Sequence, residues 1–270
     1  MTSPEGSTDR PLAPGPAAPQ GPPAAPWPGG PGPTPPAAPD GRRTHRWGLG
    51  AFLLAEGVFL LVSWVVGAAV LAQGAPSVAG LGLVLAVPTV VAAAVALAAT
   101  WLRGHGPCRD LGLWWSWRDV GIGLAFGFGG LFLTGAAALV WGALVGPDAT
   151  SAVGEVFAGQ RAELPVALVI LVIVVLVAPL CEEILYRGLL WGALEKLGAG
   201  RWIAAGVTTL VFALLHFEIL RTPLLLVATI PIALARVHTG RLLASVVAHQ
   251  VNNLLPGIAL VLALTGVVQL

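Results

Sequence analysis

The stretch Ala178-Pro-Leu-Cys-Glu-Glu-Ile-Leu-Tyr-Arg-Gly-Leu-Leu190 sets two adjacent carboxylates and an arginine directly after a hydrophobic run, Leu164 to Ala178. A carboxylate at membrane depth is costly, so an intramembrane glutamate is by default a functional-site hypothesis. A helix end does not explain the two charges, because the apolar pattern resumes beyond them. The sequence therefore predicts a helix over 165–192 that carries Glu182 and Glu183 into the membrane.

Composition defines the class of protein. Hydrophobic residues make up 56% of the chain and charged residues 10%, with a mean hydropathy of +0.85, whereas soluble domains carry about 25% charged residues. The chain is therefore predicted to be an all-α, polytopic membrane protein whose first partner is the lipid bilayer. A net charge of +1 does not indicate a basic surface for binding nucleic acid. The two cysteines, Cys108 and Cys181, are expected to be free thiols.

The apolar runs can be counted against the roughly 20 residues that a helix needs to cross a bilayer. This count predicts about eight transmembrane helices, the last four of them short, with a break at Pro256 between the last two. The predicted ranges are 48–73, 76–101, 119–145, 165–192, 201–217, 222–236, 241–254 and 256–270.

The N-terminal region has a different composition. Residues 1–46 hold 14 of the 23 prolines and almost no large aliphatic residues. Such a segment has too little apolar surface to offset the entropy of ordering. We expect a disordered, proline-rich cytoplasmic tail over 1–46, followed by a transmembrane domain over 47–270 whose motifs lie at about 165–255.

The basic residues predict the orientation in the cell membrane. With eight helices, all their clusters fall on one side, which would be cytoplasmic and would hold both termini. The opposite loops carry Arg161 and Arg221 among several acidic residues. The clusters are Arg42, Arg43 and Arg46; Arg103, Arg109 and Arg118; Lys196 and Arg201; and Arg236 with Arg241.

Polar residues at membrane depth recur in the C-terminal half. The turn at Gly198-Ala-Gly200 would place Glu182 and His216 at the same level of a helical hairpin, each about 25 Å from the turn at 1.5 Å per residue. His249 and Asn253 are spaced i, i+4 and share one helix face. We expect these residues and Glu183 to converge.

Each of these residues also has a structural interpretation. A histidine in a membrane helix is often an interhelical hydrogen-bond donor rather than a catalyst. Arg187 lies four residues after Glu183, the spacing of a same-face ion pair, whereas Glu182 is rotated by about 100° and is free to face a cavity. Phe212 is interpreted as packing.

Two further features of the N-terminal half need an interpretation. Glu56 is a single carboxylate in the first helix, for which the sequence offers no partner. Gly123 and Gly127 have the spacing of close helix contact rather than of a dinucleotide loop.

Three motifs, Glu182-Glu183-xxx-Arg187, Phe212-xxx-His216 and His249-xxx-Asn253, resemble those of the CPBP family. These are the CAAX-protease and bacteriocin-processing (Abi) membrane endopeptidases, and the likeness covers about residues 165–255. The resemblance implies an intramembrane protease in which Glu182 activates water. It also implies that the other motif residues, Glu183, Arg187, His216, His249 and Asn253, belong to the catalytic site.

The chemistry agrees with that implication. Peptide hydrolysis needs an activated water, a stabiliser for the oxyanion and a proton donor for the leaving amine. Glu182, His216 and His249 are also ligand types for a catalytic divalent metal such as zinc, but an HExxH helix is absent. Both a metal-dependent and a metal-independent mechanism therefore stay open.

Two other functions use the same buried acids. One is a transporter or proton-coupled carrier, although the internal repeats typical of transporters are not evident. The other is an inactive immunity or scaffold protein of the same fold. For a protease, the substrate would be a membrane-associated protein or peptide, with or without a lipid, of the CAAX or the bacteriocin-related type.

Overall fold

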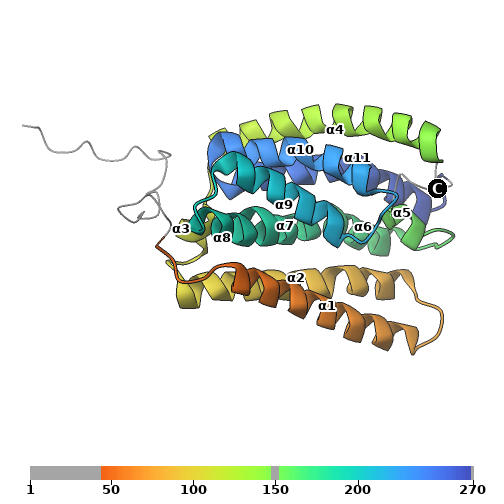
Figure 1. The fold of residues 1–270 in the computed structure, drawn as a ribbon. Coiled ribbons are helices and arrows are strands. Elements are labelled where there is room, and N and C mark those ends of the chain that lie inside the picture. The colour runs from red at the N-terminus through yellow and green to blue at the C-terminus, as the bar shows by residue number, and fades with distance from the viewer. Residues whose placement is uncertain (1–43, 147–151, 269–270) are drawn as a thin grey trace, which may run out of the picture. The chain divides into compact units, whose positions relative to one another are not determined.

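A computed structural model describes residues 44–146 and 152–268, and within these ranges all regular structure is helical (Figure 1). The predicted tail lies outside the described residues except for its last three. The α-helices are α1 (Leu49–Leu71), α2 (Val78–Arg103), α3 (Pro107–Leu111), α4 (Trp117–Val145), α5 (Ala152–Val156), α6 (Leu164–Val172), α7 (Ala178–Glu183), α8 (Trp191–Lys196), α9 (Arg201–Leu215), α10 (Thr222–Thr239) and α11 (Leu242–Leu264). Two π-helical stretches, η2 (Ile173–Val177) and η3 (Ile184–Leu190), complete the set.

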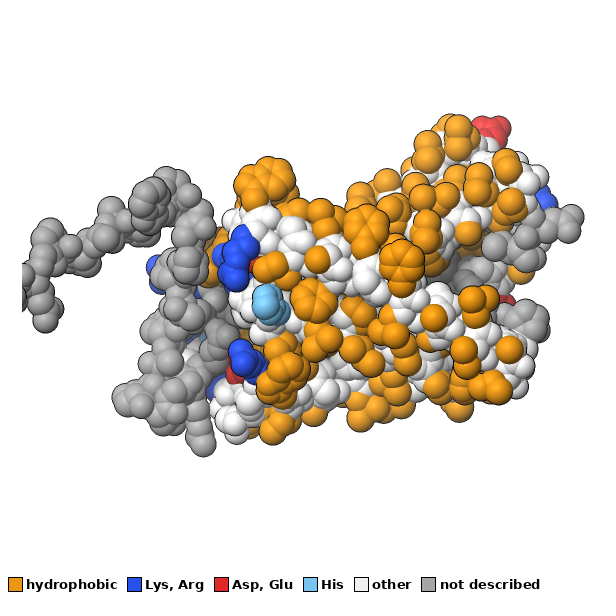
Figure 2. All heavy atoms as spheres, turned by 90° about the horizontal axis from the view of Figure 1, so that it is seen from above, with side chains coloured by type: hydrophobic (Ala, Val, Ile, Leu, Met, Phe, Trp, Pro, Cys, Tyr) orange, Lys and Arg blue, Asp and Glu red, His pale blue; other side chains and the backbone are white. Residues whose placement is uncertain are grey.

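Six helices in the described ranges are long and apolar enough to span a membrane. They are α1, α2, α4, the continuous segment Leu164–Lys196, α10 and α11, and α9 is a shorter apolar helix of 15 residues. The all-α polytopic class is confirmed, but the count of eight is not. Large apolar side chains such as Trp64, Phe132 and Leu139 point outward, and hydrophobic side chains cover most of the face shown in Figure 2.

The predicted break at Pro256 is wrong. Pro256 lies inside α11, which runs uninterrupted for 23 residues. Proline removes one backbone donor, but membrane helices tolerate it where neighbouring helices and local adjustments satisfy the freed carbonyl. The predicted helices 241–254 and 256–270 are therefore one helix.

The helix that carries the two glutamates is also continuous, but it is not a regular α-helix. From Leu164 to Lys196 it alternates between α-helical and π-helical turns, and Glu183 is the last residue before η3. Single π-helical turns inside α-helices occur frequently at functional sites. Here one of them directly follows the glutamate pair.

Several basic residues gather at one end of the helices, whereas Arg161 donates to the Ala263 carbonyl at the other. The backbone N–H of Arg46, before α1, donates to the carbonyl of Arg103 at the end of α2, at 2.7 Å. Lys196, at the end of α8, donates to the carbonyl of Trp47 at 3.0 Å. At the same end, Arg236 donates to Leu111 and Arg241 pairs with Asp119.

The two ends of the described chain lie at opposite ends of the helices. The N–H of Ala162, just before α6, donates to the carbonyl of Leu264 at the end of α11, at 3.0 Å. Trp47 contacts Lys196, at the opposite end of the same long helix (Figure 1). The prediction that both termini are cytoplasmic depended on the break at Pro256. Since α11 does not break, the geometry does not support it.

Helix α4 packs closely on α11 through its glycines, as their spacing predicted. A Cβ atom at Gly123 would lie 2.6 Å from Cβ of Val247, and one at Gly127 would lie 2.6 Å from Cβ of Val251. Val247 and Val251 share one face of α11. His249, two residues from each, projects from the other side, toward the helix of Glu183.

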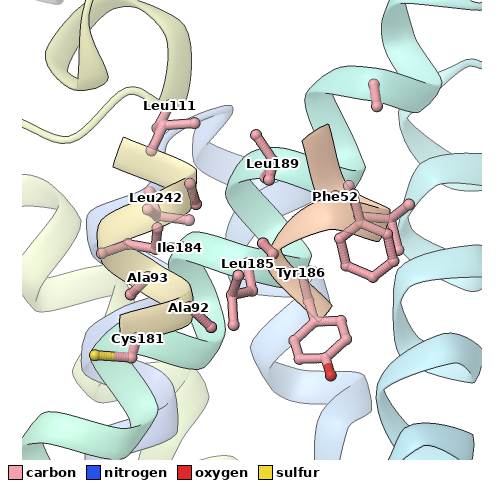
Figure 3. Close-up of a cluster of buried hydrophobic side chains, with 14 of the residues drawn as sticks. Phe52, Ala92, Ala93, Leu111, Cys181, Ile184, Leu185, Tyr186, Leu189 and Leu242 are labelled. Atoms are coloured by element: carbon pink, nitrogen blue, oxygen red, sulfur yellow. The ribbon is translucent and has the colours of Figure 1, made fainter. Parts of the chain in front are cut away.

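A hydrophobic cluster surrounds the turns that follow Glu183. Leu185, Tyr186 and Leu189 of the π-helical stretch η3 pack against Phe52 of α1 (Figure 3). This packing holds α1 against the glutamate helix at the level of the two glutamates. Ala92 and Ala93 of α2, Leu111 of α3 and Leu242 of α11 belong to the same cluster.

Candidate active site

Glu183 is the centre of a buried polar cluster. Its side chain is 0% exposed, and its Oε1 atom lies 3.1 Å from Arg187 Nη1, which is equally buried. The ion pair expected from the i, i+4 spacing is therefore present. The same oxygen lies 3.0 Å from Nδ1 of His249 on α11. Two partners thus fix the same oxygen of this carboxylate, which offsets part of the cost of its burial.

His249 lies between the two glutamates. Because a carboxylate only accepts hydrogen bonds, the contact with Glu183 assigns a proton to Nδ1 of His249. The other ring nitrogen, Nε2, lies 3.6 Å from Oε2 of Glu182. The Glu182 side chain is 23% exposed, whereas that of Glu183 is 0% exposed. The two adjacent carboxylates therefore have different environments and contact opposite sides of one imidazole.

Phe212 joins the three motifs. Its ring lies 4.4 Å from that of His216 and 5.8 Å from that of His249, measured between centroids. The guanidinium of Arg187 lies over the same ring at 4.8 Å, a distance at which a cation is attracted by the ring quadrupole. Phe212 is a packing residue, as predicted, and its ring packs against the two histidines and the arginine of the site.

His216 lies where α9 ends. The next residue, Phe217, has a φ of +55°, a left-handed conformation that stops the helix. The Nδ1 atom of His216 donates to the carbonyl of Phe212 at 2.7 Å, because a carbonyl only accepts. The Nε2 atom is thereby left as the nitrogen available to another group.

Asn253 has a partner outside this cluster. Its Nδ2 atom donates to the carbonyl of Val174 in the π-helical stretch η2, at 3.2 Å. It lies one helical turn from His249, as the spacing predicted, and it fastens α11 to the glutamate helix. The described contacts do not join Asn253 directly to Glu182 or to either histidine.

The predicted metal ligands do not form a metal site in this structure. Across residues 44–146 and 152–268, no group of three His, Cys, Asp or Glu side chains is arranged to hold one ion. Glu182 and His249 approach each other at 3.6 Å, but His216 does not join them in such a group. We therefore derive no step through a metal.

Ser245 is a site residue that the sequence interpretation missed. It is buried one turn before His249 on α11, donates to the Leu242 carbonyl at 2.9 Å, and shares the helix face from which His249 contacts Glu183. The sequence pattern could have predicted it, because Ser245, His249 and Asn253 repeat at four-residue intervals and so share one helix face.

The fold and the cluster define a class, a polytopic helical membrane protein with a buried glutamate, histidine and arginine centre. Residues 164–255 match the family model described as Type II CAAX prenyl endopeptidase Rce1-like. The match confirms the resemblance to the CPBP family, and it covers all six predicted site residues. The family is one of proteases that act in the membrane. No curated protein and no solved structure is matched by this chain.

Proposed function

We propose that this protein is an intramembrane endopeptidase that hydrolyses a peptide bond with water activated by Glu182. The observation that carries the proposal is the placement of His249 between two carboxylates, 3.0 Å from Glu183 and 3.6 Å from Glu182. Glu183 and Arg187 hold the imidazole from one side, and the partly exposed Glu182 meets its other side. A histidine whose ring is oriented by a buried carboxylate is a common arrangement in hydrolytic enzymes.

The reaction follows from these groups. A water bound between Glu182 and His249 gives one proton to Glu182, and its oxygen bonds to the carbonyl carbon of the peptide. The amide of Asn253 or a histidine donates to the oxyanion of the tetrahedral intermediate. Glu182 then returns the proton to the nitrogen as the C–N bond breaks. The products are a carboxylic acid and an amine, so the atoms balance without another reactant.

The substrate is a membrane-associated protein or peptide. The basic end of the helices is the cytoplasmic side on the distribution of arginine and lysine. His249 lies seven residues into α11 from that end, a depth of about 10 Å at 1.5 Å per residue. This depth fits a substrate terminus anchored at the cytoplasmic leaflet, as in CAAX-type or bacteriocin-related processing.

The experiment compares membrane proteomes of cells that carry the wild-type gene, no gene, or the Glu182→Gln variant. The expected result is a peptide terminus that is processed in the first strain and unprocessed in the other two. If the Glu182→Gln strain shows the same processed terminus as wild type, water activation by Glu182 is wrong.

A further inference from the structure

Glu56 is a carboxylate inside α1, outside the segment that matches the protease family. Its Oε1 atom is buried and has no hydrogen-bond partner among the described residues. An ionisable group in a membrane helix is costly and, by default, marks a functional site. An unsatisfied buried oxygen calls for an explanation in the same way.

Glu56 and His249 lie equally far along their helices from the basic end. Helices α1 and α11 both begin at the basic end, and both beginnings are tied to the segment around α3. Trp47 Nε1 donates to Asp110 at 2.8 Å, and the N–H of Leu242 donates to the carbonyl of Gly112 at 3.3 Å. Glu56 is seven residues after the start of α1, and His249 is seven after the start of α11. Each is therefore about 10 Å from that end.

The neighbours of Glu56 belong to the site. One turn earlier on α1, the ring of Phe52 meets the ring of Tyr186 edge-on, with centroids 5.9 Å apart (Figure 3). Glu56 shares a helix face with Phe52, and the titratable groups around its carboxyl are those of Tyr186, His216 and Glu182. Tyr186 in turn lies against Phe212, at 5.1 Å between ring centroids. Glu56 thus reaches the site along the side of Tyr186.

From this placement we infer that Glu56 is a positioning residue of the active site, which holds Tyr186 from α1 and acts on His216 through Tyr186 and Phe212. The inference rests on the proposed function. Nδ1 of His216 is held by the Phe212 carbonyl, and the Phe212 ring lies against both Tyr186 and His216. The support for His216 would thus come from α1 through packed rings, whereas His249 is held by direct contact with Glu183.

The first test is kinetic and uses the full-length enzyme with a cleaved peptide. Glu56→Gln should lower kcat by about tenfold, because a displaced Tyr186 would no longer hold the Phe212 ring against His216, while KM stays within about twofold. Glu56→Asp should recover part of kcat. The matched control is Ser63→Ala, two turns further along the same helix, which should cleave like wild type. A Glu56→Gln enzyme with wild-type kcat would overturn the inference.

The second test does not need activity. In protein labelled with ¹⁵N-histidine, the His216 ring resonances, assigned with a His216→Gln variant, should shift in Glu56→Gln and stay in place in Ser63→Ala. The exposed His238 should not respond in either variant. Unchanged His216 resonances in folded Glu56→Gln would reject the positioning role even if no substrate is cleaved. Conversely, if the His216 resonances shift in Glu56→Gln but the wild-type protein cleaves no peptide, the positioning role of Glu56 stands and the proposed function is rejected.

Discussion

The Nδ1 atom of His249 lies 3.0 Å from Oε1 of Glu183, although 66 residues separate the two in the chain. The contact joins the first and last motifs and decides which ring nitrogen carries the proton. It also turns Nε2 toward Glu182 at 3.6 Å. Glu183 therefore has structural partners, and Glu182 is the carboxylate that we propose for the chemistry.

Glu182→Gln should give a folded, thermally stable and inactive protein. Glutamine keeps the size and hydrogen-bonding capacity of glutamate but cannot accept the proton of the attacking water. The measurement is the melting temperature in detergent together with cleavage of the substrate terminus. Cleavage by this variant at close to the wild-type rate would show that Glu182 is not the general base.

Glu183→Gln should lose stability as well as activity. It leaves Arg187 buried without its countercharge and replaces the charged acceptor of His249 with a neutral amide. Breaking a buried pair by removing one partner typically costs about 3–5 kcal/mol. A melting temperature equal to that of Glu182→Gln would contradict the different roles assigned to these neighbours.

Phe212→Ala should destabilise the protein by about 3–5 kcal/mol, as is typical for the loss of a buried phenylalanine. It should also lower activity, because His216, His249 and Arg187 all contact this ring. The control is Phe132→Ala on α4, where the side chain is 82% exposed. Chemical denaturation and peptide cleavage would be measured for both variants, and equal losses would argue against a central role for Phe212.

Gly127→Ala should disturb α11 and reduce activity. The added Cβ would lie 2.6 Å from Cβ of Val251, so the two helices must move apart, and overpacking of this kind typically costs about 1–3 kcal/mol. The shift would pass to His249 on the same helix. Gly129→Ala is the matched control, since no atom lies within 4 Å of its added Cβ. Wild-type cleavage by Gly127→Ala would show that the site tolerates movement of α11.

Local spacing along a helix predicted a large part of the site. The pair Glu183 and Arg187 was predictable because residues four apart lie on one face whatever surrounds the helix. The close contact at Gly123 and Gly127 was predictable for the same reason. Ser245 could have been found in this way, since it completes a four-residue repeat with His249 and Asn253.

The number of helices was less predictable. Proline ends a helix when nothing satisfies the carbonyl that it frees, and continues within one when neighbours do. The neighbours of Pro256 are set by packing, so its position in the chain does not decide the outcome. With the helix continuous, the two ends of the described chain lie at opposite ends of the helices, and the predicted common side for both termini loses its basis.

The amino-acid sequence by itself determined that this is a helical membrane protein and which charged residues lie within its apolar helices, because hydropathy and helical periodicity are properties of the chain. It also determined the three motifs. Only the tertiary structure decided that His249 is shared by Glu182 and Glu183, that Phe212 packs the charged centre, and that Glu56 has neighbours in the site. Periodicity defines the faces of each helix, but the rotation and depth at which two helices meet follow from the packing of all of them together.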